Sequence, residues 1–279
     1  MINRLAIDNI IKNALLEDIP YEDITTDSVI FQDSTSKADL ICKEDGIICG
    51  LNVFKRVFEI LGNVDVNLFK EDGDYIKESE IVAKVKGNTR NILKGERTAL
   101  NILQRMSGIA TLTHKFAEKI KDTDAKILDT RKTTPNLRVL EKYAVLKGGG
   151  HNHRYNLSDG ILLKDNHISA AGGVKEAISL ARKNSSFVRK IEVETENLNM
   201  VKEALECKAD IIMLDNMDIE EAKKAVLLIN KRALTEFSGN VSLENVREAA
   251  QTGVNYISVG ALTHSVKSLD LSLKNLHNC

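Results

Sequence analysis

Charged or small polar residues follow six short apolar runs in the second half of the chain, and residues of these types can bind and activate an anion. The runs end at Arg131, Lys164, Glu194, Asp215, Ser238 and Gly260. In parallel α/β folds the carboxyl ends of the strands meet at one edge, where the active site lies. Two cations and two carboxylates at one edge therefore predict a single site for a charged small molecule.

The longest polar segment, residues 129–138, concentrates cations in a chain that is nearly neutral overall. It contains Arg131 and Lys132, and a triple glycine at 148–150 and the run His151-Asn152-His153-Arg154 follow it. Arginine binds carboxylates and phosphates through two parallel hydrogen bonds, so this segment predicts an anion site. A solvated loop with a glycine hinge is the alternative. The His-x-His spacing also suits a metal ligand pair, but no third ligand is evident nearby.

Two strand ends near the C-terminus run into small residues, a pattern typical of phosphate sites. Residues 238–240 and 260–265 each precede a predicted helix, and Ser242 is the expected N-cap of the first of them. In barrels, the loops after the last two strands often bind phosphate on exposed N–H groups. Glu194 and Asp215 would then be the partners of Mg²⁺ or of sugar hydroxyls. Ordinary helix capping, with glycines in tight turns, is the alternative.

From about residue 126, the elements that must position these residues are predicted to alternate between strands and helices. Six apolar runs predict buried parallel strands. They are residues 126–131, 160–164, 190–194, 210–215, 233–238 and 256–260. Amphipathic helices are predicted between most of them, which fits either a TIM-like barrel or a doubly wound sheet. Neither GxGxxG nor a P-loop is present, which disfavours the dinucleotide and NTPase versions.

The first third of the chain has a different character. Apolar spacing predicts a helix over residues 1–16, and short β-prone runs separated by glycines predict an antiparallel α+β domain over 38–86. A long helical stretch is expected over 91–120, interrupted at Ser107-Gly108. The turn at 71–76 is similar to that of a lipoyl-carrier domain, but no lysine sits at the hairpin tip, so an ordinary sheet is favoured.

Composition excludes several broad classes of function. The chain has 279 residues, enough for one large or two ordinary domains, and a net charge of -1. Such a balance gives no field to attract nucleic acid or an anionic membrane, and the absence of tryptophan disfavours a base-stacking platform. No apolar run is long enough to cross a membrane, and the start does not read as a signal peptide. With four cysteines and no CxxC, reduced thiols in the cytoplasm are expected.

The residues alone thus predict an α/β barrel enzyme that acts on a small polyanion carrying a phosphate and at least one carboxylate. Two other functions stay open at this point. Lys164 at a strand end could form a Schiff base with a carbonyl substrate. A sensor or transporter-accessory domain could bind a phosphorylated ligand without turnover.

Specific motifs across the whole chain resemble quinolinate phosphoribosyltransferases. They are residues 96–101, 107–111, 128–135, 140–145, 148–154, 163–167, 192–194, 213–216 and 257–265. The resemblance implies an N-terminal α/β sandwich over 1–110 and an incomplete TIM-like α/β barrel over 111–279, with the C-terminal tail packing back on the first domain. It also implies transfer from 5-phosphoribosyl diphosphate to quinolinate with Mg²⁺, giving nicotinate mononucleotide, CO₂ and diphosphate.

The resemblance also implies roles for single residues. Those expected to bind substrate are Arg97, Arg131, Lys132, His153, Arg154 and Lys164 for the pyridine dicarboxylate, and Ser238, Gly239, Gly260 and His264 for the 5-phosphate. Catalytic roles fall to Lys164, Glu194 and Asp215, and the two carboxylates would hold Mg²⁺ indirectly. Asn136 and Asn240 stand where the family usually has glycine. Asparagine tolerates positive φ better than most residues, so both turns are expected to persist.

A homodimer is implied as well, with Arg97 acting across its two-fold interface. Two relatives of the same superfamily remain as alternatives. One is the homologue associated with molybdenum-uptake operons, which differs in substrate, and the other is the longer nicotinate-specific phosphoribosyltransferase.

Overall fold

The computed structural model describes residues 3–279 and divides into two compact units. The first unit takes in the chain up to His114, together with Thr133–Gly149 and Thr263–Cys279. The second unit consists of Lys115–Lys132 and Gly150–Leu262. Each unit is built around a sheet of its own, antiparallel in the first and parallel in the second.

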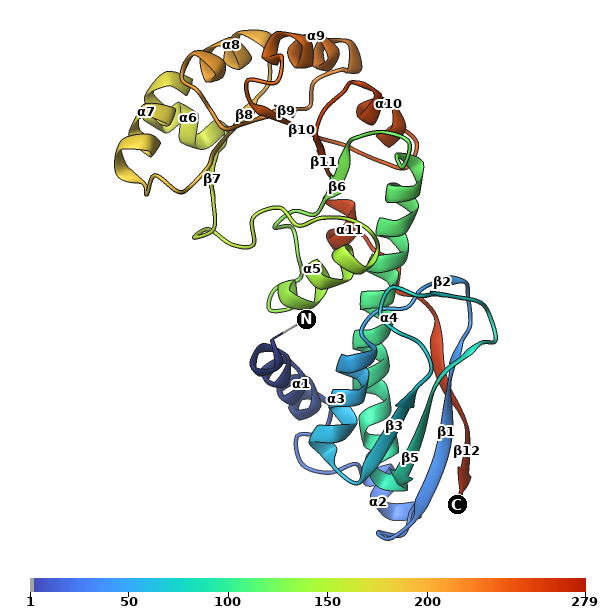
Figure 1. The fold of residues 1–279 in the computed structure, drawn as a ribbon. Coiled ribbons are helices and arrows are strands. Elements are labelled where there is room, and N and C mark those ends of the chain that lie inside the picture. Colours follow the sequence, from blue (N-terminus) through green and yellow to red (C-terminus); the bar gives the residue numbers. More distant parts are fainter. Residues whose placement is uncertain (1–2) are drawn as a thin grey trace. The chain divides into compact units, whose positions relative to one another are not determined.

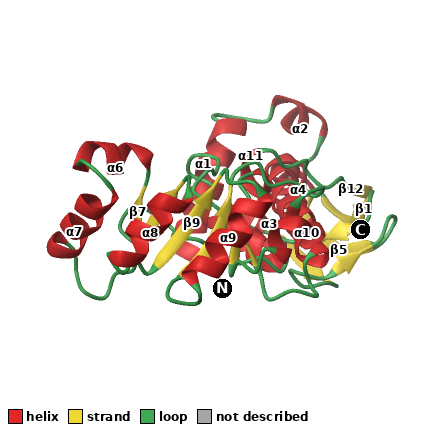
Figure 2. Ribbon diagram, turned by 90° about the horizontal axis from the view of Figure 1, so that it is seen from above, coloured by secondary structure: helices red, strands yellow, loops and turns green. Residues whose placement is uncertain are grey.

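The sheet of the first unit joins the two ends of the chain. Its four strands lie in the order β12 (Leu271–Asn278), β1 (Thr35–Cys42), β5 (Ile81–Asn88) and β3 (Val64–Leu68). All neighbours are antiparallel, and in Figure 2 β12, β1 and β5 stand together beside the C-terminus. Burial alternates along β1 because successive side chains point to opposite faces. A two-stranded pair, β2 (Gly46–Ile47) with β4 (Tyr75–Ile76), lies outside this sheet.

Helices α3 (Leu51–Leu61) and α4 (Thr89–Lys119) run beside this sheet (Figure 1). The remaining helices assigned wholly or partly to the first unit are α1 (Arg4–Asp18), α2 (Ile24–Val29), α5 (Arg138–Lys147) and α11 (Ala261–His264). The segment with the lipoyl-like turn holds the start of α3. The carboxylate of Asp72 accepts hydrogen bonds from the N–H groups of Gly50 and Leu51, and from the hydroxyl of Tyr143.

The break predicted at Ser107-Gly108 is wrong, because α4 continues through it. Small residues are needed there for close approach, not for a kink. A Cβ on Gly108 would lie 2.2 Å from the carbonyl oxygen of Lys267. The Ser107 hydroxyl accepts from the N–H of Cys49 and donates to its carbonyl group. Both residues therefore let other backbone segments pack directly against the helix.

All strands of the second unit are parallel and lie in the order β6-β11-β10-β9-β8-β7. They are β6 (Lys126–Leu128), β7 (Ile161–Leu163), β8 (Ile191–Thr195), β9 (Ile211–Asp215), β10 (Leu234–Ser238) and β11 (Tyr256–Ser258). This confirms the six predicted strands. Within residues 3–279, β6 and β7 do not pair with each other, so the barrel stays open, as the incomplete-barrel prediction requires.

Helices cover the outer side of these strands, as Figure 1 shows for α7 to α10. They are α6 (Asp165–Ala171), α7 (Val174–Asn184), α8 (Leu198–Glu206), α9 (Ile219–Ile229) and α10 (Val246–Gln251). Each of α7, α8 and α9 buries small or aliphatic residues on one face, such as Ala222, Ala225 and Ile229 of α9. Because the helices occupy the outer face, the inner face of the sheet is left for the charged side chains.

Candidate active site

The carboxyl ends of the six parallel strands carry most of the residues predicted from sequence. Lys164 follows β7 directly, Glu194 lies in β8, and Asp215 and Ser238 are the last residues of β9 and β10. The register pairs Ser238 with Asp215, so these two strand ends lie side by side. The structure therefore brings the predicted strand-end residues to one edge of the second unit.

Lys164 and Glu194 form an ion pair at this edge, with the Nζ atom of Lys164 3.1 Å from the Oε1 atom of Glu194. The Lys164 side chain is 44% exposed, whereas that of Glu194 is 14% exposed. An ammonium group beside a carboxylate can bind anions but has no lone pair with which to attack a carbonyl group. This geometry favours a binding role for Lys164 over a Schiff base.

The turn after β10 needs residues that tolerate positive φ. Gly239 has φ +99°, and a Cβ there would lie 2.3 Å from the Oδ1 atom of Asn216. Asn240 and Asn136 adopt φ 51° and 66°, so asparagine keeps both turns, as predicted. The side-chain amide of Asn240 donates to Asn216 at 3.3 Å.

The prediction that Ser242 caps the following helix is wrong. Helix α10 begins later, at Val246, and its N-cap is Asn245. The Ser242 hydroxyl instead accepts from the N–H of Glu244, within the turn that precedes the helix. Because this turn comes first, the helix begins three residues later than the sequence predicts.

A partly buried histidine, His153, contacts two buried glutamates among these strands, and the sequence reasoning missed both glutamates. The Nε2 atom of His153 is 3.0 Å from the Oε2 atom of Glu192 and 3.4 Å from that of Glu236. Burial raises the pKa of Glu192 to about 7. Burial lowers the pKa of His153, but its hydrogen bonds to the two glutamates outweigh this effect and raise that pKa to about 10. The cluster therefore retains protons at neutral pH.

Two guanidinium groups occupy the same part of the second unit. Burial, and next the positive charge of Arg131, lower the pKa of Arg154. The Nη1 atom of Arg154 donates to the carbonyl oxygen of Gly160 at 3.1 Å, which fixes the side chain. Two cations that repel each other in a partly buried position are stabilised when a dianion binds between them.

The first unit contains a clamp around Arg105, which the sequence reasoning also missed. Its guanidinium binds the carboxylate of Glu141, the hydroxyl of Thr134 at 2.7 Å and the carbonyl oxygen of Thr263 at 3.0 Å. Glu141 also accepts from the N–H of Thr134. One side chain thus contacts the segment after β6 and the segment after β11. Both segments are close in sequence to predicted site residues.

Three other predicted residues are exposed. Lys132 is exposed and follows Arg131. His264 is exposed in α11, where its Nδ1 atom lies 2.6 Å from the Ser265 hydroxyl. Arg97 is exposed on α4 in the first unit, and its role stays a prediction.

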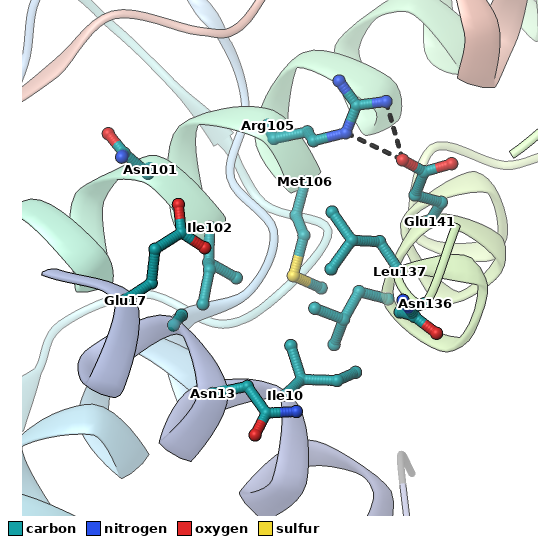
Figure 3. A pocket seen from close by; sticks show the side chains of 12 residues that line it. Ile10, Asn13, Glu17, Asn101, Ile102, Arg105, Met106, Asn136, Leu137 and Glu141 are labelled. Carbon is teal, nitrogen blue, oxygen red and sulfur yellow. Dashed lines mark hydrogen bonds and ion pairs between the residues drawn. The ribbon is translucent and has the colours of Figure 1, made fainter. Parts of the chain in front are cut away.

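A cavity of about 390 Å³ between α1, α4 and α5 does not suit a phosphorylated substrate (Figure 3). Ile10, Ile102 and Met106 give it a largely apolar lining. Its arginine, Arg105, is already neutralised by Glu141. A polyanion would gain no cation there, so the strand ends of the second unit are the better site.

Comparison with known proteins identifies the family. The family model described as "Quinolinate phosphoribosyl transferase, N-terminal domain" matches residues 23–107, and the one for the C-terminal domain matches residues 109–274. The chain belongs to the quinolinate phosphoribosyltransferase family. The resemblance that the motifs indicated is thereby confirmed.

Relatives with curated names cover almost the whole chain. The chain is 44% identical to the probable nicotinate-nucleotide pyrophosphorylase (carboxylating) of Bacillus subtilis, over 97% of this chain and 94% of that protein. It is 45% identical to the chloroplastic nicotinate-nucleotide pyrophosphorylase (carboxylating) of Arabidopsis thaliana, over 95% and 81%. The crystal structure of NadC from Streptococcus pyogenes has a TM-score of 0.97 and 44% identity, covering 100% of this chain and 99% of that one.

Removing the Arg105 side chain is expected to leave a buried charge. The Glu141 side chain is only 1% exposed, so Arg105→Met should destabilise the protein by about 3 kcal/mol. The double variant Arg105→Met with Glu141→Gln removes that charge and should recover part of the loss. Denaturant unfolding of the variants measures both effects.

An exposed ion pair supplies the control. Arg247 and Asp122 are each at least half exposed, so Arg247→Met should destabilise the protein far less than Arg105→Met does. Equal losses for the two arginine variants would contradict the role given to the clamp.

Proposed function

We propose that this protein transfers the phosphoribosyl group of 5-phosphoribosyl diphosphate to quinolinate, with loss of CO₂. The products are nicotinate mononucleotide and diphosphate, as in NAD synthesis. The observation that carries the proposal is the set of cations and carboxylates at the strand ends of a chain that belongs to this family. The names of its relatives, nicotinate-nucleotide pyrophosphorylase and quinolinate phosphoribosyltransferase, support it.

The pyridine dicarboxylate binds to the cations of the second unit. The positive charge of Arg131 acts on Arg154, and a doubly charged acceptor would relieve the repulsion between them. Lys164, already held by Glu194, adds a third positive charge. Lys132 extends this group, and His153 belongs to it through the backbone of Arg154. Three or more cations suit two carboxylates better than one.

The phosphoribosyl donor binds at the ends of β9, β10 and β11. The 5-phosphate is held by Ser238, Gly239, Gly260 and His264. Because Gly239 has no side chain, its backbone can approach a ligand closely. The oxygen donors of Glu194 and Asp215, on adjacent strands, fit the preference of Mg²⁺ for carboxylates and water. When bound, Mg²⁺ supplies positive charge to the departing diphosphate.

The carboxylates act on the charge that develops during the reaction. Departure of diphosphate leaves positive charge on the ribose carbon, and Glu194 and Asp215 stabilise that charge electrostatically. Their positions are fixed before the reaction begins. Glu194 is held by Lys164, and Asp215 accepts a hydrogen bond from the Asn216 side chain at 2.7 Å. Preorganised groups avoid the cost of reorientation in the transition state.

A homodimer completes the proposed site. Arg97 of one protomer reaches the strand ends of the partner. Exposed apolar side chains on and near α1 and α2 support a surface there that a partner protomer covers, because Leu5, Tyr21, Ile24 and Phe31 are each more than two-thirds exposed.

Among the described residues no helix is long and apolar enough to cross a membrane. We place the enzyme in the cytoplasm.

Acceptor choice tests the proposed function against its alternatives. Quinolinate should be consumed with release of CO₂ and nicotinate mononucleotide, whereas nicotinate should not, because it leaves part of the cation cluster without a partner. The assay supplies 5-phosphoribosyl diphosphate, Mg²⁺ and either acid. Equal use of nicotinate would favour the nicotinate-specific alternative. Absence of turnover with both acids would favour the molybdenum-operon type or a binding protein.

Mixing two inactive variants tests the shared site. Arg97→Ala and Lys164→Ala should each be inactive alone. After joint unfolding and refolding, random pairing makes about half of the dimers mixed, and each mixed dimer holds one intact site. Activity should return to about one quarter of the wild-type value. No recovery, with mixed dimers confirmed by mass spectrometry, would show that Arg97 does not act across the interface.

A further inference from the structure

Lys164 occupies the N-cap of α6, a position to which lysine is poorly suited. Its backbone is extended, with φ -101° and ψ 169°, and its carbonyl oxygen accepts from the N–H of Ile168 at 2.9 Å. N-caps are usually Ser, Thr, Asp or Asn, because their side chains accept from the N–H groups of the first turn. A lysine side chain can only donate, and that of Lys164 makes no capping hydrogen bond. The helix start therefore does not explain this residue, whereas a binding role at the strand ends does.

The ring of His167 supplies a hydrogen bond that the start of α6 would otherwise lack. Its Nδ1 atom accepts from the N–H of Lys164 at 3.1 Å. His167 is the third residue of the helix, where glutamate or glutamine makes the same contact in a capping box. His167 is exposed, so packing does not explain its position. The motif over residues 163–167, which the proposed function uses only for Lys164, thus contains a second residue that acts on Lys164.

Two anchors fix the backbone at Lys164. On the strand side, Leu163 pairs with Val193 in the parallel sheet, so the register holds the chain up to the last residue of β7. On the helix side, the contact with His167 holds the N–H of Lys164 itself. The Lys164 side chain is long and almost half exposed, so surrounding side chains do not confine it. The direction in which its ammonium group points, 3.1 Å from Glu194, therefore depends on how the backbone is held.

We propose that His167 is a positioning residue that holds the backbone of Lys164 and thereby aims its ammonium group at the pyridine dicarboxylate. The proposal rests on the proposed function for the identity of the ligand. His167 acts through the backbone hydrogen bond and does not contact the acceptor. Its contribution to binding therefore exists only while the ammonium group of Lys164 is present.

Glutamine and leucine in place of His167 separate the hydrogen bond from the size of the side chain. A glutamine oxygen at the third helical position can accept from the Lys164 N–H, as in a capping box, whereas leucine cannot. We expect His167→Gln to bind quinolinate nearly as the wild type does. His167→Leu should bind it roughly tenfold more weakly, the cost of one lost hydrogen bond. The matched control, His277→Leu, removes an exposed histidine of β12 and should leave the affinity unchanged.

A double-mutant cycle distinguishes positioning from a general structural role. Quinolinate affinity is measured by calorimetry for the wild type, His167→Leu, Lys164→Met and the variant with both changes. If His167 acts through the ammonium group, His167→Leu should cause no further loss once Lys164→Met has removed that group. A residue that bound the acceptor itself, or that stabilised the unit as a whole, would weaken binding by the same factor in both backgrounds.

Nitrogen NMR tests the hydrogen bond without any ligand. In the ¹⁵N spectrum of the wild type, assigned by comparison with His167→Gln, the ring of His167 should carry its proton on Nε2, because Nδ1 accepts from Lys164. The spectrum is recorded at about pH 9, above the usual titration range of histidine. If quinolinate proves not to bind, the proposed function fails, and the tautomer alone then decides whether His167 holds Lys164.

Four results would overturn the proposal. They are an Nδ1–H pattern for His167, a folded leucine variant with wild-type quinolinate affinity, a glutamine variant that loses as much affinity as the leucine one, and an equal loss from His167→Leu with and without Lys164. If the leucine variant does not fold, or if Lys164→Met leaves binding too weak to measure, the glutamine variant and the spectrum still decide.

Discussion

Charge buried within a parallel sheet must be balanced by groups on neighbouring strands, and this requirement shapes the whole inner face of the second unit. Lys164 after β7 is balanced by Glu194 of β8. Glu192 of β8 and Glu236 of β10 meet at the ring of His153. Because the strands are parallel, the Lys164–Glu194 pair lies at the edge formed by the carboxyl ends of the strands, where a ligand can bind to it. Glu192 and Glu236 stay buried, so they can interact only with neighbouring side chains.

The first unit includes two segments that are separated in sequence from its opening stretch. Thr133–Gly149 and Thr263–Cys279 belong to it by contact, although they flank β6 and β11 of the second unit in sequence. Arg105 binds both segments, and β12 pairs with β1 along its length. The residues just beyond these segments, Arg131 and Gly260 among them, are proposed ligands.

The sequence predicted the parts of the structure that depend on local pattern. Short apolar runs bounded by polar residues located all six parallel strands, and their last residues included Lys164, Glu194 and Asp215. Positive φ at Asn136 and Asn240 followed from the chemistry of asparagine. The local pattern gives a wrong prediction where a small residue packs against a segment that is remote in sequence. Gly108 looks like a helix break, but it lies inside α4, where it allows close packing of another backbone segment.

The missed residues are those whose partners are remote in sequence. Glu192 and Glu236 were visible as charges inside apolar strands, and their two-residue spacing from Glu194 and Ser238 was the available signal. Nothing local, however, joins either of them to His153. Arg105 shows no signal at all, because it lies on a long amphipathic helix among other charged residues and its partners come from two segments that are remote in sequence.

We propose that the strand-end carboxylates Glu194 and Asp215 act on the charge of the transition state and not on the acceptor. Glu194→Gln and Asp215→Asn test it most directly, because each keeps the shape and removes the charge. Single-turnover kinetics should show a large fall in the rate of phosphoribosyl transfer, while calorimetry shows quinolinate binding close to that of the wild type. Loss of quinolinate binding with the rate of transfer intact would contradict the account.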